Sequence, residues 1–391
     1  MVYTHTATLD SYMEYVQERV TTLHDLREPT PPAPTDRTAV VVPMTEREYA
    51  GLGAERVLSE LEAVDPARVV VPLGAPAEKV GPFREWLADF DLSLDVLWCD
   101  GPRVSDLLAD HGLNGSAGKG RDVWLALGQV CDADYVVCHD ADTKTYDRSY
   151  VPRLLFPLEH GHEFSKGYYA RVENGRLYGR FFRLFYAPLV RALSDATPEA
   201  DILQYLSAFR YALAGEFAAT GDLVGRMRVQ RSWGLEVGTL GEVFAATGFD
   251  GSAQVDLGAY EHDHRAVGGP TGLSDMSQAV GDALCRVVSE HGVNIEYATL
   301  ADRYRAAADG LIDQYAVDAA YNELTFDPAD EREQIDTYAE TIGEPGEDTR
   351  LPAWRDAPIS PDAVADAAAA DLRAATSDSM PAEPSVGNRL N

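Results

Sequence analysis

Two aspartates, Asp140 and Asp142, directly follow an apolar run, Tyr135 to His139, that has the pattern of a buried strand. In open parallel sheets ligands bind beyond the carboxyl ends of the strands, so both carboxylates are well placed to hold a divalent cation. Mg²⁺ or Mn²⁺ is the expected ion, and it would neutralise the charge of a leaving diphosphate. The alternative is a pair of solvated acids in a turn, which is common in a chain this acidic.

Two further segments could contribute to the same ligand site. The motif Gly118-Lys119-Gly120 brackets one of only four lysines with glycines, which suggests a flexible loop that carries a cation to a phosphate or a base. After Pro43, at the end of the first apolar run, Glu46 and Glu48 could accept hydrogen bonds from a base or a ribose. Taken alone, a surface loop and an exposed helix start are the simpler explanations.

Glu216 and two histidines complete the candidate residues. Glu216 lies among small apolar residues, and a carboxylate in that setting is either partnered or functional. His262 and His264 follow a predicted strand at alternate positions, so both could face one side, where a histidine could join an aspartate in a metal shell. A surface polar turn accounts for the histidines equally well.

The charge of the chain excludes two classes of partner. Its 391 residues include 64 acidic and 33 basic side chains, which gives a net charge of −31 at pH 7. Nucleic acid and anionic lipid would be repelled, and no apolar run approaches the roughly 20 residues that a membrane span needs. The acid-rich, arginine-rich composition resembles that of cytoplasmic proteins of halophiles, so we predict that folding or activity depends on salt.

The cysteines and the first residues favour a cytoplasmic protein. The four cysteines lie singly in apolar runs, which favours core thiols over a zinc cluster or a disulfide framework. The first 20 residues lack the basic start and apolar stretch of a signal peptide and have the pattern of an amphipathic helix.

Apolar runs alternate with helical stretches over the first 160 residues. The runs that favour buried strands are Thr38 to Val42, Val69 to Val71, Leu94 to Cys99 and Tyr135 to His139. Helical patterns separate them, as over Tyr49 to Ala63 and Arg121 to Val130. This alternation predicts an α/β fold with a parallel, Rossmann-like sheet.

The second half of the chain mixes strand and helix patterns. An Asn-Gly turn predicts a hairpin within residues 164–181, a helix begins at Phe182, and Gly251 to Gly258 predicts another strand. Residues 274–320 predict at least two amphipathic helices, which could cover the core or form a homodimer interface. From about Asp356 the composition predicts a disordered or weakly helical tail.

We therefore expect four regions. They are an N-terminal helix with a proline-rich linker (1–36), a catalytic domain (37–270), a helical extension (271–355) and the tail (356–391).

The order of the motifs resembles that of the retaining nucleotide-sugar transferases that make glucosyl-3-phosphoglycerate or its mannosyl counterpart. The resemblance spans about Thr38 to Arg265. It rests on Pro43 to Glu48, Gly118-Lys119-Gly120, Asp140-Ala141-Asp142, Ser165-Lys166, Gly179-Arg180, Leu213 to Ala218, Trp233 to Gly238, and Val255 to Gly258 followed by His262. It implies a GT-A fold, a Rossmann-like core with a mixed sheet and a C-terminal helical extension. It also implies transfer of a hexose from UDP-glucose, GDP-glucose or GDP-mannose to a small anionic acceptor such as 3-phosphoglycerate, with retention.

The resemblance also implies roles for individual residues. Asp142 and His262 match metal ligands for Mg²⁺ or Mn²⁺, and Asp142 and Glu216 match catalytic positions. The donor-binding positions are Pro43, Glu46, Glu48, Gly118, Lys119 and Asp140, and the acceptor-binding positions are Gly179, Arg180, His264 and Arg265. Departures fall on the acceptor side, where Phe182 replaces a small hydroxyl residue and the segment around His262 is less basic than in the family.

Two other functions are compatible with the residues. A sugar-phosphate nucleotidyltransferase would also use an α/β core, a glycine-lysine loop and paired aspartates, although its glycine-rich first loop is absent after Pro43. A non-catalytic relative would bind a nucleotide sugar without turning it over.

Overall fold

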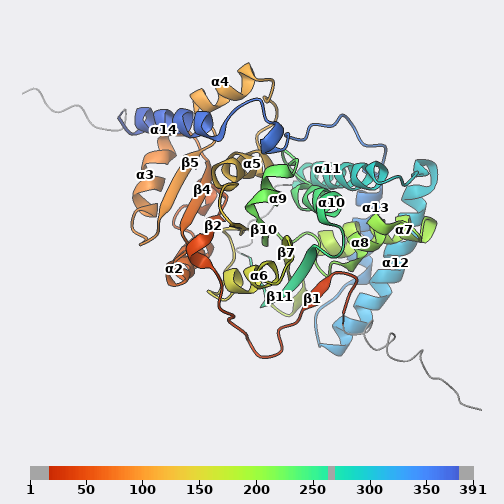
Figure 1. Cartoon of the computed structure of the whole chain (residues 1–391). Helices are drawn as coiled ribbons and strands as arrows, with labels where there is room; N and C mark the ends of the chain where they lie inside the picture. The colour runs from red at the N-terminus through yellow and green to blue at the C-terminus, as the bar shows by residue number, and fades with distance from the viewer. Residues whose placement is uncertain (1–16, 263–268, 378–391) are drawn as a thin grey trace, which may run out of the picture.

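The centre of the molecule is a mixed β-sheet with helices on both faces (Figure 1). The computed structural model describes residues 17–262 and 269–377, and within them nine strands form this sheet. They are β1 (Thr21–Leu23), β2 (Thr38–Val41), β3 (Met44–Thr45), β4 (Arg68–Gly74), β5 (Leu94–Trp98), β6 (Tyr135–Cys138), β7 (Phe164–Ala170), β10 (Phe217–Thr220) and β11 (Ser252–Ala259). The four strands predicted in the first half are all confirmed.

One strand runs against the others. The order is β1-β11-β7-β10-β6-β2-β4-β3, with β5 also paired to β4, and the neighbouring pairs are parallel except those of β10. Because β10 is antiparallel to β6, its first residue, Phe217, lies opposite Cys138, the last residue of β6. The sheet is therefore mixed, and the chain that enters β10 lies at the carboxyl end of β6.

Apolar side chains on both faces of the sheet explain the two helical layers. In β2 all four residues are buried, and Val40 and Val41 belong to different core clusters on opposite faces. The helices that contribute to the core around Val40 are α2 (Leu52–Val64), α3 (Ala77–Leu87) and α6 (Tyr150–Glu159). Those around Val41 include α4 (Pro102–Asp110), α5 (Lys119–Val130) and α9 (Gly221–Arg226).

Most of the remaining helices gather beside the sheet, at the right of Figure 1. They are the π-helical turn η3 (Phe182–Tyr186), α7 (Ala187–Ala196), α8 (Asp201–Ala208), α10 (Leu235–Thr247), α11 (Gly269–Glu290), α12 (Tyr297–Tyr321) and α13 (Pro328–Ala339). The helices predicted within residues 274–320 are confirmed as α11 and α12. The long helix α12 packs on α7 and α13, so its apolar face covers this chain's own core.

The predicted hairpin is also confirmed. Strands β8 (Val172–Glu173) and β9 (Arg176–Leu177) pair antiparallel around Asn174 and Gly175. Both turn residues have positive φ, 49° and 67°, as a two-residue turn of this kind requires.

The two ends of the chain differ from expectation. Residues 361–377, expected in a disordered or weakly helical tail, form the ordered helix α14 (Pro361–Ser377). It packs on α3, α4 and β5 because buried Val364 and Ala368 give it an apolar face. The strand β1 lies within the expected linker region, pairs in parallel with β11 and extends the sheet. The expected N-terminal helix falls largely on residues 1–16, outside the described residues. Within the described ranges, no helix combines the length and apolarity needed to cross a bilayer.

Candidate active site

A cavity of about 210 Å³ opens beyond the carboxyl ends of β2 and β6. Its lining residues are Pro43, Met44, Thr45, Glu48, Lys119, Asp122, Asp140, Ala141 and Asp142. The three segments that the sequence singled out after the first strand, before α5 and after β6 therefore meet around one space. This convergence follows from the parallel pairing of β2 with β6, because parallel neighbours end at the same edge.

Asp142 and His262 lie side by side, although 120 residues separate them. The His262 Nδ1 atom is 3.1 Å from the Asp142 Oδ1 atom, and a bridge between Thr143 and His262 joins the two segments. The Lys144 amide also donates to the Glu261 carbonyl at 2.9 Å. The loop after β6 is thus fixed against the loop after β11.

The carboxylate and imidazole of Asp142 and His262 are suitable ligands for Mg²⁺ or Mn²⁺. Such ions take one or two protein carboxylates, keep several waters and complete their shell with substrate phosphates, while imidazole is a common ligand for transition metals. Among the described residues no cluster of three His, Cys, Asp or Glu side chains could enclose a metal. Asp142 and His262 therefore fit an open metal site that a diphosphate would complete.

Lys119 is the first residue of α5 and the cation of the cavity. Its Nζ atom lies 2.6 Å from Asp140 Oδ1 and 3.3 Å from Glu236 Oε1. Although burial opposes the charged amine, these two carboxylates raise the pKa of Lys119 well above its ordinary value. Burial likewise opposes ionisation of Asp140, but Lys119 lowers the pKa of Asp140 below its ordinary value. Both groups are therefore charged at neutral pH.

Glu216 is completely buried where the chain enters β10. Its Oε1 atom accepts a hydrogen bond from the Tyr260 hydroxyl, whereas its Oε2 atom has no partner among the described residues. Burial, reinforced by the Asp140 carboxylate, raises the pKa of Glu216. A Cβ atom on Gly215 would lie 2.5 Å from Asp140 Oδ2, so only glycine allows the two carboxylates this approach. A buried, half-satisfied carboxylate beside the cavity is the kind of group that binds a ligand hydroxyl.

A second lysine lies beneath this site. Lys166 on β7 is 1% exposed, and its Nζ atom donates to the Ala214 carbonyl at 2.7 Å. Burial lowers the pKa of Lys166 to about 8 even though Glu236 and Glu216 oppose the shift. Lys166 thereby ties β7 to the turn that presents Glu216.

Of the other residues expected to bind the nucleotide-sugar donor, some line the cavity and others do not. Pro43 and Glu48 line the cavity, and Gly118 caps α5, but Glu46 lies exposed on the short helix η2 (Glu46–Glu48) and is not among the lining residues. The Glu48 carboxylate accepts hydrogen bonds from the Thr45 amide and hydroxyl at 2.6 and 2.7 Å. Glu48 thus also closes the turn after β2.

The expected acceptor residues are only partly brought together. Gly179 has φ of 72°, and a Cβ atom there would lie 3.2 Å from the Tyr211 hydroxyl. Arg180 forms ion pairs with Asp330 and Glu331 of α13, the latter at 3.0 Å, so the guanidinium is held by carboxylates of this chain. His264 and Arg265 lie outside the described residues.

Three tyrosines at the site had no predicted role. Tyr260 stacks on Tyr169 with ring centroids 3.7 Å apart, and Tyr169 contacts Tyr211 at 4.8 Å. They form an aromatic wall from Glu216 toward Gly179. The alternation of an extended segment could have indicated Tyr260, which lies two residues before His262. The other two rings come from distant parts of the chain, and no local pattern marks them.

Comparisons with known proteins place the chain in a family. No protein-family model matches it. The chain is 34% identical over 383 residues to the glucosyl-3-phosphoglycerate synthase of Methanococcoides burtonii, which covers 88% of this chain and 93% of that protein. It is 36% identical over 321 residues to the protein of the same name from Persephonella marina, covering 78% and 79%.

Solved structures show the same fold. Glucosyl-3-phosphoglycerate synthase from Mycobacterium tuberculosis with Mn²⁺, UDP and phosphoglyceric acid gives a TM-score of 0.52 at 21% identity, covering 71% of this chain and 88% of that one. Its complex with Mn²⁺, UDP-glucose and phosphoglyceric acid gives 0.53 at 23% identity, covering 71% and 89%. The expected GT-A fold is confirmed. From the identity and coverage of its relatives, the chain belongs to the glucosyl-3-phosphoglycerate synthase family of glucosyltransferases.

Proposed function

We propose that this protein transfers glucose from UDP-glucose to 3-phosphoglycerate, with Mn²⁺ or Mg²⁺ and with retention of configuration. The observation that carries the proposal is that Asp142 and Lys119 line one cavity, with His262 beside Asp142. Buried Glu216 follows Gly215, which packs against the Asp140 carboxylate. The relatives that match most of the chain are named as synthases of this product, and a solved structure of the same fold was obtained with Mn²⁺, UDP-glucose and phosphoglyceric acid.

The metal has a defined place in this proposal. Asp142 and His262 would hold it, and when bound it supplies positive charge to the diphosphate that leaves. Lys119 adds a second, permanent cation at the positive end of α5. Asp140, which holds Lys119, orients that amine toward the cavity.

Glu216 orients the sugar in the proposed mechanism. Its unpartnered Oε2 atom would accept a hydrogen bond from a glucose hydroxyl, while Tyr260 fixes the carboxylate through Oε1. The bond from the sugar's anomeric carbon to the diphosphate breaks, and a bond to the acceptor's hydroxyl forms on the same face. The hydroxyl proton passes to the departing diphosphate. The products are glucosyl-3-phosphoglycerate and UDP.

The acceptor's anionic groups require cations near Gly179. Arg180 follows Gly179, and Arg171 donates to the Tyr211 hydroxyl at 3.3 Å, the same hydroxyl that Gly179 faces. The Arg171 Nε atom is buried without a partner among the described residues. A guanidinium suits a carboxylate or a phosphate, so we assign Arg171 together with Arg180 to the acceptor pocket.

Calorimetric binding tests the donor and the metal. In molar KCl with Mn²⁺, wild type should bind UDP-glucose in preference to GDP-glucose and GDP-mannose, and binding should be lost without metal. Asp142→Ala and His262→Ala should lose metal-dependent binding and turnover, whereas Asp132→Ala, which removes an exposed aspartate outside the cavity, should retain both. Retained activity in both site variants would contradict the metal assignment.

Product analysis separates the alternative functions. Release of UDP with transfer of glucose to 3-phosphoglycerate supports the proposal. Release of pyrophosphate from UTP and glucose 1-phosphate would indicate a nucleotidyltransferase, and tight donor binding without turnover would indicate a non-catalytic relative.

A further inference from the structure

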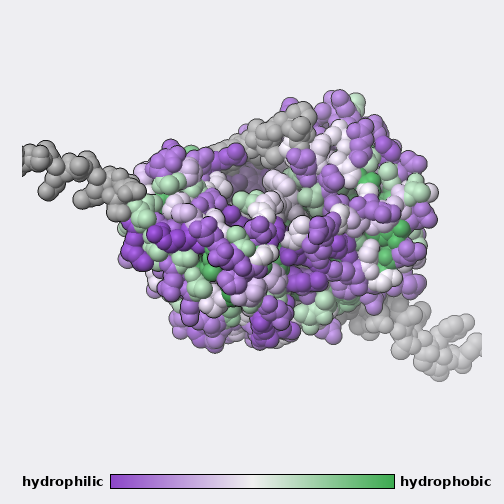
Figure 2. Space-filling model, turned by 90° about the horizontal axis from the view of Figure 1, so that it is seen from above, coloured by the Kyte–Doolittle hydropathy of each residue, from purple (hydrophilic) through white to green (hydrophobic). Residues whose placement is uncertain are grey.

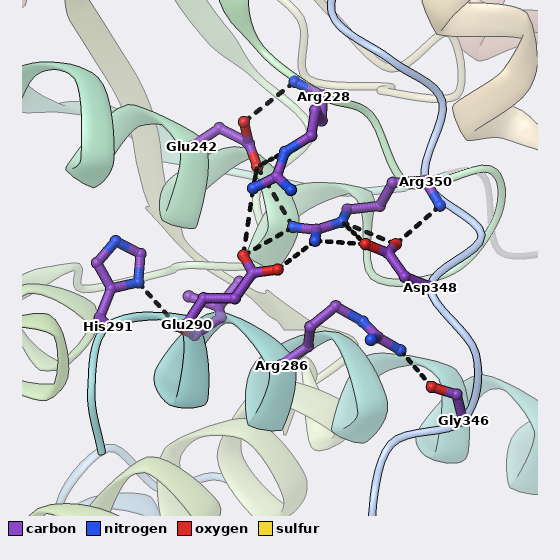
Figure 3. Close-up of polar contacts among 9 residues, drawn as sticks. Arg228, Glu242, Arg286, Glu290, His291, Gly346, Asp348 and Arg350 are labelled. Atoms are coloured by element: carbon purple, nitrogen blue, oxygen red, sulfur yellow. Dashed lines mark hydrogen bonds and ion pairs between the residues drawn. The ribbon is translucent and has the colours of Figure 1, made fainter.

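The segment between α13 and α14, residues 343–360, crosses the molecule as an extended strap. In Figure 1 it runs along the top from the helices at the right to α14 at the left. We call residues 343–360 the strap. Its anchor is Arg350, whose side chain is only 2% exposed and pairs with three carboxylates: Glu242, Glu290 and Asp348 (Figure 3). The hydrogen bonds from Arg350 lower the pKa of Asp348 to about 2 and hold the pKa of Glu290 below its ordinary value, so these two carboxylates are ionised at neutral pH.

Beside its anchor, the strap pairs with the segment that precedes α10. Val229 and Leu351 exchange two backbone hydrogen bonds, of 3.0 and 2.8 Å. Two residues further along, the Arg231 Nε atom donates to the Thr349 carbonyl at 2.9 Å. The strap therefore holds residues 229–231 through both backbone and side chain.

The same short segment supports the first turn of α5. The Arg121 amide donates to the Arg231 carbonyl at 2.8 Å. A Cβ atom on Gly120 would lie 1.8 Å from the Gln230 carbonyl oxygen, so the two backbones touch. Lys119, the cation of the cavity, is the residue before Gly120.

A second contact ties the strap directly to the middle of α5. Trp354 stacks on Trp124 with ring centroids 4.2 Å apart and planes 14° apart. The Trp354 indole donates to the Trp124 carbonyl at 2.6 Å, and the Trp124 indole donates to the Pro352 carbonyl at 2.8 Å. Such reciprocal bonds fix both the height and the rotation of α5 against the strap.

Arg231 joins the two sets of contacts. It is 9% exposed, and its Nη1 atom has no hydrogen-bond partner among the described residues. Its guanidinium lies 3.2 Å from the position of a Cβ atom on Gly115, in the loop that leads to Lys119. A buried arginine nitrogen without a hydrogen bond lowers the stability of the fold. A role of Arg231 in positioning α5 explains why the residue is present despite that cost.

We propose that the strap, acting through Arg231 and Trp354, is a positioning element that holds Lys119 at the diphosphate of the nucleotide-sugar donor. The inference rests on the proposed function, because it takes the donor to bind where Lys119 lines the cavity. Neither Arg231 nor Trp354 lines the cavity, so we take their effect on the donor to pass through α5.

Hydrogen exchange tests the mechanical link without any ligand. In the full-length chain, Arg231→Met and Trp354→Phe should raise amide exchange in residues 118–124 by about tenfold. Arg231→Met removes the side-chain bond between the strap and residues 229–231, which support the start of α5, and Trp354→Phe removes the indole bond to the Trp124 carbonyl. Trp354→Phe keeps an aromatic ring over Trp124, so folding is preserved even if larger changes are not tolerated. Arg332→Met, which breaks exposed ion pairs with Asp309 and Asp313 elsewhere, is the control and should leave these amides unchanged.

Donor affinity tests the functional consequence. With Mn²⁺, Arg231→Met and Trp354→Phe should weaken UDP-glucose binding by about tenfold, while the KM for 3-phosphoglycerate stays within about twofold. In the Lys119→Met background the same substitutions should weaken the donor no further, because there is no amine left to position. If Arg231 and Trp354 only stabilised the fold, their substitution would weaken UDP-glucose binding by the same factor in wild type and in Lys119→Met.

Each outcome has a defined meaning. Unchanged exchange in residues 118–124, or additive effects with Lys119→Met, would overturn the proposal. Arg231→Lys distinguishes the hydrogen bond to the strap from the positive charge, because lysine keeps the charge and loses the Nε bond. Wild-type affinity of this variant for UDP-glucose would also overturn the proposal. If wild type binds neither UDP-glucose nor UDP while the exchange result holds, the proposed function fails and the strap's link to α5 stands.

Discussion

Glu216 is the residue whose environment departs most from that of an ordinary carboxylate. It is completely buried, its Oε2 atom has no hydrogen-bond partner within residues 17–262 and 269–377, and burial together with Asp140 raises its pKa. We predict that Glu216→Gln lowers kcat by about a hundredfold while donor binding persists, because the amide keeps the shape and loses the charge. Steady-state kinetics with UDP-glucose and 3-phosphoglycerate would show this.

Removal of the Tyr260 hydroxyl is a milder change at the same site than substitution of Glu216. Tyr260→Phe should lower kcat by about tenfold, because the Glu216 carboxylate then loses the hydrogen bond from the Tyr260 hydroxyl. The control is Tyr146→Phe, since the buried Tyr146 hydroxyl has no partner to lose. Equal losses in both tyrosine variants would contradict a positioning role for Tyr260.

Lys166 predicts a specific dependence of stability on pH. Its pKa is about 8 in the folded protein against 10.5 as the ordinary value, so between these limits the unfolded chain binds the proton and the folded chain does not. As far as Lys166 is concerned, the free energy of unfolding is therefore highest above pH 10.5, and it decreases as the pH falls from 10.5 to 8.

Urea unfolding of wild type and Lys166→Met measures this effect. From pH 8 to pH 10.5 the free energy of unfolding of wild type should rise relative to the variant by on the order of 3 kcal/mol. Lys79→Met, which removes an exposed lysine, should follow wild type. A constant difference between wild type and Lys166→Met across this range would contradict a lowered pKa.

At the scale of elements, α14 provides the N-terminal cap of helix α4. Asp371 is fully buried, and its carboxylate accepts hydrogen bonds from the Arg103 and Val104 amides at 2.9 and 3.1 Å, so it caps the start of α4 from across the fold. A Cβ atom on Gly101 would lie 2.3 Å from this carboxylate, so glycine at that position admits the cap. Helix α14 is therefore part of the folded structure.

Removing this cap should destabilise the whole protein. We predict that Asp371→Ala lowers the free energy of unfolding by about 2 kcal/mol, because two helix-start amides and the Arg103 guanidinium lose their partner. Denaturant unfolding measures the loss. Asp366→Ala on the exposed face of the same helix is the control, and an equal loss there would show that only helix propensity is involved.

At the scale of the whole molecule, surface charge dominates. The net charge is −31, and the face seen in Figure 2 is largely hydrophilic. Because molar salt shortens the Debye length to about 3 Å, repulsion among these carboxylates should fade as KCl is added. We predict a rise in Tm of about 10 °C between 0.1 and 2 M KCl.

Differential scanning calorimetry tests the salt effect. Sucrose at matched osmolality is the control, because it is excluded from the protein surface without screening charge. A Tm that rises equally in sucrose would assign the effect to solvent exclusion, and an unchanged Tm in KCl would contradict the prediction.

Local patterns were sufficient for the elements that carry their own signal. The β-branched runs of β2, β4 and β6 predicted a layered α/β core, and the Asn174-Gly175 pair predicted the hairpin, because strand burial and a two-residue turn depend on neighbouring residues alone. Asp142 and His262 were expected at one metal site, His262 on the family resemblance. The structure brings the two side chains together, and their metal role stays a prediction. For the tail, a disordered or weakly helical segment was expected, because α14 is rich in alanine. Its few apolar side chains are buried only in the assembled fold, against α3, α4, α5 and β5.

The sequence by itself determined the strands β2, β4, β5, β6 and β11, the charge and the position of Asp142 after β6, because these depend on residue type and local spacing. Only the tertiary structure decided that β10 runs antiparallel beside β6, which carries Glu216 to the end of the strand that bears Asp140. It also decided that Arg180 is held by carboxylates of α13 and that the strap supports α5. These contacts join residues more than 70 positions apart, and their energy comes from burial and pairing in the assembled fold, which no local pattern encodes.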